Sequence, residues 1–119
     1  MIVKPEEILF TNKGGGVSQR MLGYRPQLMA VEMTFAKGST MPPHSHPDHL
    51  QGIYIVKGSF EITCGGETSI MNAGDMCYAD KGEIHSTLSL EDDSILLDIH
   101  TPMREDILKE GLDYNSHHK

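Results

Sequence analysis

The chain has 119 residues, of which 38% are hydrophobic and 23% charged, and its formal net charge is -7. This length and composition predict one soluble globular domain with a single core. The acidic balance and the lack of a Lys/Arg-rich run argue against nucleic acid as a partner. No apolar stretch indicates a signal peptide or a membrane span, and Cys64 and Cys77 alone make no disulfide framework, so we expect a cytoplasmic protein.

The hydrophobic pattern predicts an all-β domain. Residues 1–26 follow no regular period and are predicted to be irregular. Alternation of apolar and polar residues, or a short β-branched run, predicts strands over 27–37, 52–56, 59–64, 67–71 and 94–101. Gly65 and Gly66 predict a hairpin turn, and further glycine turns separate the other strands. Short strands between such turns are typical of an antiparallel sandwich or barrel.

The end of the chain predicts a short helix. Thr101 is a suitable N-cap and Pro102 a suitable first helical residue, so the helix is expected over about 102–109. The polar residues 111–119 are expected to form a mobile tail, and its histidines, His117 and His118, receive no functional role. No linker divides the chain, so one domain over 1–119 is expected, with its core at about 27–101.

A metal site is the main functional prediction. Three side chains that can bind a metal lie close together in the sequence: His44, His46 and Gln51. A fourth candidate, His85, follows later in the chain. Pro42 and Pro43 keep the first segment extended, so His44 and His46 can point to one side and share an ion. Imidazole is the commonest protein metal ligand, and a side-chain amide oxygen can join it.

Each of these histidines taken alone is more often a surface or hydrogen-bonded residue than a ligand, but their combined spacing favours metal binding. His49 lies on the same stretch and could substitute as a ligand, although a loop-surface position is preferred. Three imidazoles and an amide leave two positions of a six-coordinate ion for water or substrate. Mixed nitrogen and oxygen ligation suits Ni, Zn, Fe, Mn or Co and does not choose between them.

The two blocks that carry these residues resemble the paired motifs of the cupin superfamily. The first motif is Gly, five residues, His-x-His, three or four residues, Glu, six residues and Gly, matched here by Gly38, His44, His46, Gln51 (for Glu) and Gly58. The second is Gly, five residues, Pro-x-Gly, two residues, His, three residues and Asn, matched by Gly74, Asp80 (for Pro), Gly82, His85 and Ser89 (for Asn). The resemblance implies a double-stranded β-helix (a jelly-roll barrel), a divalent transition metal on the two His-containing motifs, and a homodimer.

Two charged residues outside the motifs, Asp98 and Arg104, are further candidates for functional roles. Asp98 interrupts an apolar strand and shares its face with Leu96, so we expect it to point into the barrel; the alternative is a solvated carboxylate on an exposed face. Arg104 has two interpretations. It is either a surface charge paired with Glu105 or Asp106, or a bidentate contact for a substrate carboxylate.

Residues 97–106 resemble the signature Leu-Asp-x-x-x-Pro-Met-Arg-Glu-Asp of the KdgF family of small pectin-degradation cupins, and the similarity spans roughly residues 8–108. The resemblance implies metal-dependent ring opening of 4,5-unsaturated uronates to the 5-keto-4-deoxyuronate. It also implies Asp98 and Arg104 as catalytic residues. Gln51 cancels no charge of a bound ion, which favours an anionic sugar-acid substrate. His100 departs from the family, which usually has Phe at that position, and this departure affects the expected shape and polarity of the pocket but not the presence of the site.

Two other functions stay open. One is an oxygen-dependent cupin dioxygenase, which would need a redox metal; many of these enzymes keep the Glu that is Gln51 here. The other is a non-catalytic cupin that binds a sugar or small acid. Sensor cupins usually carry a DNA-binding helical domain, for which 119 residues leave no room.

Overall fold

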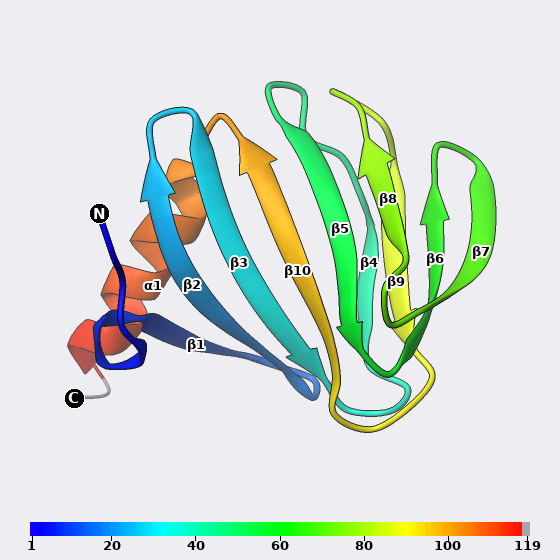
Figure 1. Ribbon diagram of the computed structural model, residues 1–119, viewed down its shortest axis with the longest axis horizontal. Helices are drawn as coiled ribbons and strands as arrows, with labels where there is room; N and C mark the ends of the chain where they lie inside the picture. The colour runs from blue at the N-terminus through cyan, green and yellow to red at the C-terminus, as the bar shows by residue number, and fades with distance from the viewer. Residues whose placement is uncertain (118–119) are drawn as a thin grey trace.

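The fold consists of two antiparallel sheets and one α-helix, drawn in Figure 1 from a computed structural model that describes residues 1–117. A short 3-10 helix, Pro5–Glu7, precedes the first strand. The strands are β1 (Leu9–Gly14), β2 (Val17–Arg25), β3 (Leu28–Phe35), β4 (Thr40–His44), β5 (Leu50–Lys57), β6 (Ser59–Cys64), β7 (Glu67–Asn72), β8 (Met76–Ala79), β9 (His85–Ser89) and β10 (Ser94–Thr101). The helix, α1, is Glu105–His117.

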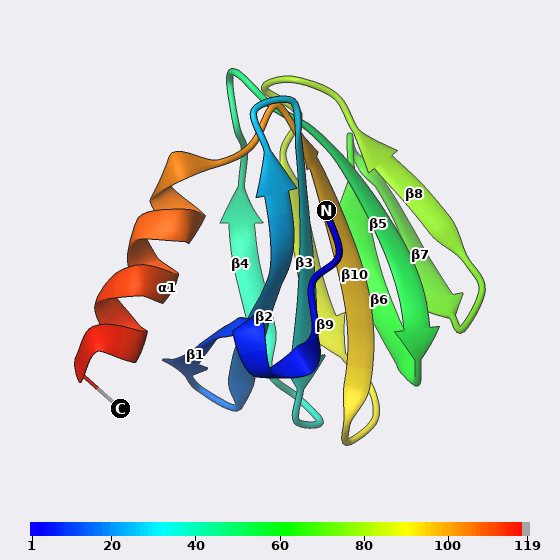
Figure 2. The same cartoon turned by 60° about the vertical axis from the view of Figure 1, so that its left-hand side comes forward.

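The two sheets face each other, as Figure 2 shows. The larger has the order β1-β2-β3-β10-β5-β8 and the smaller the order β4-β9-β6-β7. Strands far apart in sequence are therefore neighbours, such as β3 with β10 and β4 with β9. This double-sheet architecture is the predicted all-β cupin fold.

The core lies between the sheets and follows the predicted alternation. Along β3, every second residue is buried, beginning at Met29 and ending at Phe35. Phe35 meets Phe60 of the opposite sheet edge to face, with ring centroids 5.2 Å apart, a favourable aromatic geometry. Gly58 makes the sharp turn from β5 to β6 with a φ of 78°, where a Cβ would lie 2.8 Å from the Cβ of Ser94. The motif glycine is therefore required by both conformation and space.

The prediction that residues 1–26 are irregular is wrong, because β1 and β2 occupy most of that segment. Strand β2 does alternate, and its buried residues are Val17, Gln19 and Met21. The polar Gln19 on the buried face weakens the hydrophobic period, so the apolar alternation of this strand is not apparent in the sequence. The core therefore begins well before residue 27 and includes Val17 and Met21.

The predicted helix boundaries are also wrong. Thr101 is the last residue of β10, Pro102 follows through a cis peptide bond, and α1 begins at Glu105. The helix continues to His117, through residues expected to be a mobile tail; His118 lies outside the described residues.

Gly111 lets the helix pack closely against β1. It is buried, and a Cβ at this position would lie 3.2 Å from the Cβ of Leu9 on β1. The glycine therefore allows close helix–strand packing rather than ending the helix. The amide of Asn115 also donates a hydrogen bond of 2.9 Å to the carbonyl of Phe10. Among the described residues, no helix is long and apolar enough to cross a membrane.

Candidate metal centre and active site

Three histidines converge between the sheets. His44 ends β4 and His85 begins β9, and the two are direct partners in the strand pairing, with ring centroids 4.1 Å apart. The ring of His46 lies 5.0 Å from that of His44 and 5.4 Å from that of His85. One ring nitrogen from each histidine lies within 4.8 Å of the other two. This spacing is short enough for the three nitrogens to bind one ion.

The route that brings His46 into this cluster differs from the prediction. The extended segment was expected to hold His44 and His46 on one face of a strand, but β4 ends at His44 and His46 lies in the following loop. The carbonyl of His46 accepts a 2.8 Å hydrogen bond from the backbone N–H of Gly82. This bond ties the loop to the turn before His85 and so holds the two motif blocks together.

Hydrogen bonds orient two of the imidazoles. Nδ1–H of His44 donates to the carbonyl of Pro42 at 2.7 Å, and Nδ1–H of His85 donates to the carbonyl of Glu83 at 3.1 Å. A proton held on Nδ1 leaves the lone pair on Nε2 free to bind a metal. Nε2 of His46 accepts a hydrogen bond of 3.2 Å from Nη1 of Arg104, so a cation would compete with Arg104 for that lone pair.

Burial favours the uncharged form of His46 and His85. Loss of solvent, together with the positive charge of Arg104, lowers the pKa of His46 to about 4. Burial also lowers the pKa of His85. Because neutral imidazole is the form that coordinates a cation, both side chains are ready to bind one at neutral pH.

The remaining donor atoms fit a divalent transition metal. Gln51, on β5, is buried and lines the same cavity as the three histidines. Oε1 of Gln51 and Nε2 of His85 are both buried and have no hydrogen-bond partner among the described residues. A buried polar atom left unpaired costs about 1–3 kcal/mol, so two such acceptors at one cavity indicate a cationic or hydrogen-bonding ligand. Three imidazole nitrogens and one amide oxygen form a suitable set for such an ion.

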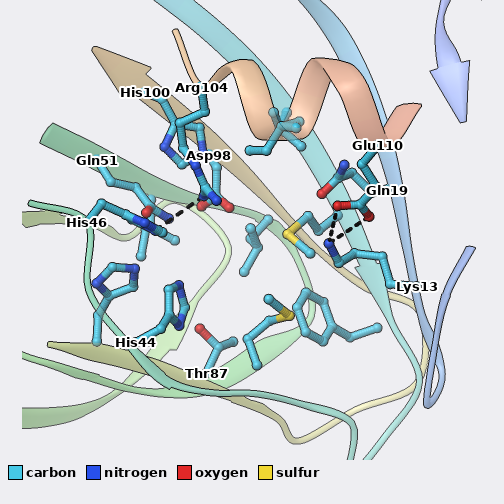
Figure 3. A pocket seen from close by; sticks show the side chains of 18 residues that line it. Lys13, Gln19, His44, His46, Gln51, Thr87, Asp98, His100, Arg104 and Glu110 are labelled. Atoms are coloured by element: carbon cyan, nitrogen blue, oxygen red, sulfur yellow. Dashed lines mark hydrogen bonds and ion pairs between the residues drawn. The ribbon is translucent and has the colours of Figure 1, made fainter. Parts of the chain in front are cut away.

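Asp98 faces the same cavity, as expected from the strand alternation (Figure 3). The cavity has a volume of about 90 Å³. Asp98 is 7% exposed, and its Oδ1 has no hydrogen-bond partner in the described part of the chain. Burial raises the pKa of this carboxyl group to about 7, although the amide of Gln51 and the charge of Arg104 act in the opposite direction. A carboxyl group with this pKa can take up and release a proton near neutral pH.

Arg104 forms the predicted ion pair with Asp106 and also lines the cavity. Its Nε and Nη2 donate to the two carboxylate oxygens of Asp106, at 3.2 and 2.6 Å. Its Nη1 points the other way, to His46 inside the cavity. Asp106 thus holds two nitrogens of the guanidinium and leaves the third directed at the site.

The far end of the cavity contains residues that the sequence did not identify. Gln19 of β2 and an ion pair between Lys13 of β1 and Glu110 of α1 line this end (Figure 3), and the Lys13 and Glu110 atoms are 2.9 Å apart. Lys13 and Gln19 lie in strands where the sequence predicted irregular structure, and Glu110 lies just beyond the predicted end of the helix. His49 is half-buried and donates from Nδ1 to the carbonyl of Pro102 at 3.1 Å, outside the group of three converging histidines.

Comparison with known proteins gives consistent matches. The Cupin domain family model matches residues 31–100, which include both motifs. The pectin degradation protein KdgF of Dickeya dadantii is 38% identical over 103 residues, which cover 87% of this chain and 94% of that protein. The structure of KdgF from Halomonas sp. has a TM-score of 0.85 and 31% identity, over 90% of this chain and 99% of that one. An RmlC-like cupin from Shewanella frigidimarina has a TM-score of 0.82 and 32% identity, over 89% and 94% of the two chains.

Proposed function

The chain belongs to the cupin family, and we propose that it is a metal-dependent enzyme that opens the ring of 4,5-unsaturated uronates. The observation that carries this proposal is the buried carboxyl group of Asp98, which shares one cavity with three converging imidazoles and a guanidinium. Similarity to two proteins named KdgF, one of them described as a pectin degradation protein, supports uronates as the substrate class.

The proposed reaction is an internal rearrangement that needs no oxidant or reductant. The hydroxyl group at carbon 1 loses its proton, and the bond between carbon 1 and the ring oxygen breaks to give an aldehyde. The ring oxygen keeps the electron pair and becomes an enolate beside the carboxylate. Protonation at carbon 4 then gives the 5-keto-4-deoxyuronate, so the product has the same atoms as the substrate.

Two residues of the chain would act directly on this substrate. Asp98 would accept the hydroxyl proton and return a proton to carbon 4, a role that its pKa of about 7 suits. Arg104 would bind the substrate carboxylate through the nitrogen that it directs into the cavity.

The metal ligands would be His44, His46, Gln51 and His85. A divalent cation held by these residues would supply positive charge near the oxygen on which negative charge develops. Because all four side chains are uncharged when they bind, the full charge of the cation would act on the substrate. The small cavity fits the reacting part of one sugar acid rather than a polymer chain.

The direct test is to add the purified protein to freshly made pectate lyase or alginate lyase product and follow the absorbance of the conjugated alkene. We expect the absorbance to fall faster with the protein than without it, and chelator to remove the acceleration. Restoring activity with individual divalent metals would identify which ions support the reaction. An unchanged rate with metal-loaded protein on both products would reject the proposal. Oxygen uptake in the same cuvette would instead indicate a dioxygenase.

The contact between Asp106 and Arg104 yields a separate prediction. Asp106→Asn keeps the shape of the side chain but removes the charge that orients the guanidinium. We expect KM for the sugar acid to rise about 3- to 10-fold with a smaller change in kcat, as the loss of one charge-assisted contact implies. Steady-state kinetics on the lyase product would measure both constants.

The matched control is Asp113→Asn, which removes an exposed ion pair with Lys109 on the same helix. Exposed pairs contribute little, so this variant should behave like the wild type. Equal KM values for the Asp106 and Asp113 variants would show that Asp106 does not position Arg104.

A further inference from the structure

His100 is a buried histidine that the proposed reaction leaves without a role. It is the last inward-facing residue of β10 and is 1% exposed. Its Nδ1 is buried and has no hydrogen-bond partner among the residues described. Native proteins satisfy nearly all buried polar side-chain atoms, so an unpaired imidazole nitrogen requires an explanation.

The position of His100 places it at the proposed active site. It follows Asp98 by two residues on the same strand, so both side chains extend from one face of β10 into the cavity. Its ring centroid lies 6.1 Å from that of His46, and its backbone pairs with Gln51 in the neighbouring strand. Figure 3 shows His100 beside Arg104 and Asp98. A molecule held by Arg104 above Asp98 would therefore lie next to the imidazole.

The imidazole of His100 is uncharged. Burial lowers its pKa to about 3, and the positive charge of Arg104 acts in the same direction. A neutral ring has one nitrogen that donates and one that accepts. Such a group suits a sugar hydroxyl, which can also donate or accept, whereas the guanidinium of Arg104 suits the carboxylate.

We infer that His100 is a substrate-binding residue whose Nδ1 forms a hydrogen bond with a hydroxyl group of the bound sugar acid. This inference rests on the proposed function for the identity of the ligand. Arg104 would then recognise the carboxylate of the ligand, and His100 would recognise a hydroxyl group. Sites built to hydrogen-bond a hydroxyl group discriminate strongly against ligands that lack it.

Three substitutions separate the hydrogen bond from the shape of the ring. His100→Asn places a polar atom near the position of Nδ1, whereas His100→Gln reaches toward the position of Nε2. His100→Phe keeps an aromatic ring and removes both nitrogens. The probe is galacturonate, a saturated uronate without the reactive double bond, and calorimetry on metal-loaded protein would measure its Kd.

We expect His100→Phe and His100→Gln to raise the Kd of galacturonate by about 10-fold or more, and His100→Asn to keep it within about 3-fold of the wild type. Metal content, measured by mass spectrometry, should be the same in all four proteins. Equal Kd values for the wild type and the Phe variant would overturn the inference, as would a wild type that does not bind galacturonate. If the Phe variant fails to fold, the Asn and Gln variants decide: equal Kd values for these two would also overturn it.

The outcome is independent of the test of ring opening. Wild-type protein that binds galacturonate through His100 but leaves lyase product unchanged would refute ring opening and retain a hydroxyl-recognising sugar-acid site. Wild-type protein that consumes lyase product, with galacturonate binding insensitive to the His100 substitutions, would refute the role of His100 and retain the enzyme.

Discussion

The Asp98→Asn variant is expected to keep the fold and the bound metal and to lose turnover of unsaturated uronate by about 100- to 10,000-fold, the usual contribution of a general acid–base group. The amide has almost the same shape as the carboxyl group but cannot carry the proton from the hydroxyl group to carbon 4. Steady-state kinetics and metal analysis on the same preparation would test this expectation. Activity within about 3-fold of the wild type would remove Asp98 from the mechanism.

The same variant gives a second readout that does not depend on activity. Because burial raises the pKa of Asp98 from 3.8 to about 7, the folded state holds the proton more tightly than the unfolded state. This group therefore lowers the stability of the wild type progressively as the pH rises from about 4 to about 7. Asn lacks this effect. In chelator-treated protein, Tm of the variant relative to wild type should rise across that window and level off above it.

Part of the site could be predicted from the sequence pattern. The strand over Ser94–Thr101 was predicted with its correct limits, because Leu96 and Asp98 alternate with apolar residues that mark the opposite face. That alternation was enough to place Asp98 inside the barrel, where it is buried. The spacing of His44 and His85 in two blocks predicted that they converge, and the pairing of β4 with β9 makes them direct neighbours.

The remaining parts of the site depend on contacts that local patterns do not contain. The length of α1 was underestimated because residues 111–119 are polar and suggested a mobile tail, whereas packing of Gly111 against Leu9 of β1 stabilises a longer helix. The ion pair between Lys13 and Glu110 joins residues 97 positions apart, and neither lies in a recognisable motif. The end of the cavity away from the histidines is therefore formed by long-range packing contacts, which local sequence patterns do not predict.

The unpaired nitrogen of His100 is another feature of the site that the sequence pattern alone does not show. The sequence showed a histidine at a position where the resembling family usually has Phe, but only the surrounding structure shows that Nδ1 lacks a partner among the described residues. A substitution pattern can thus identify an unusual residue, whereas its hydrogen-bonding capacity follows from the burial and geometry of its neighbours.

The His44→Ala variant is expected to fold but to lose at least 10-fold of its metal content relative to the wild type, because one of three converging imidazoles is removed. Mass spectrometry of the purified variant would measure the metal, and circular dichroism the fold. Tm offers an independent measure. A ligand that binds only the folded state raises Tm, so chelator should lower Tm of the wild type and leave Tm of the variant nearly unchanged.

His49→Ala is the matched control for this experiment, because His49 is also half-buried on the same stretch but lies outside the converging group. Its metal content and its response to chelator should match those of the wild type. Full metal content in the His44 variant would contradict the ligand assignment. Equal loss from both variants would show instead that the stretch holds metal without the specific geometry of His44, His46 and His85, because only that geometry distinguishes His44 from His49.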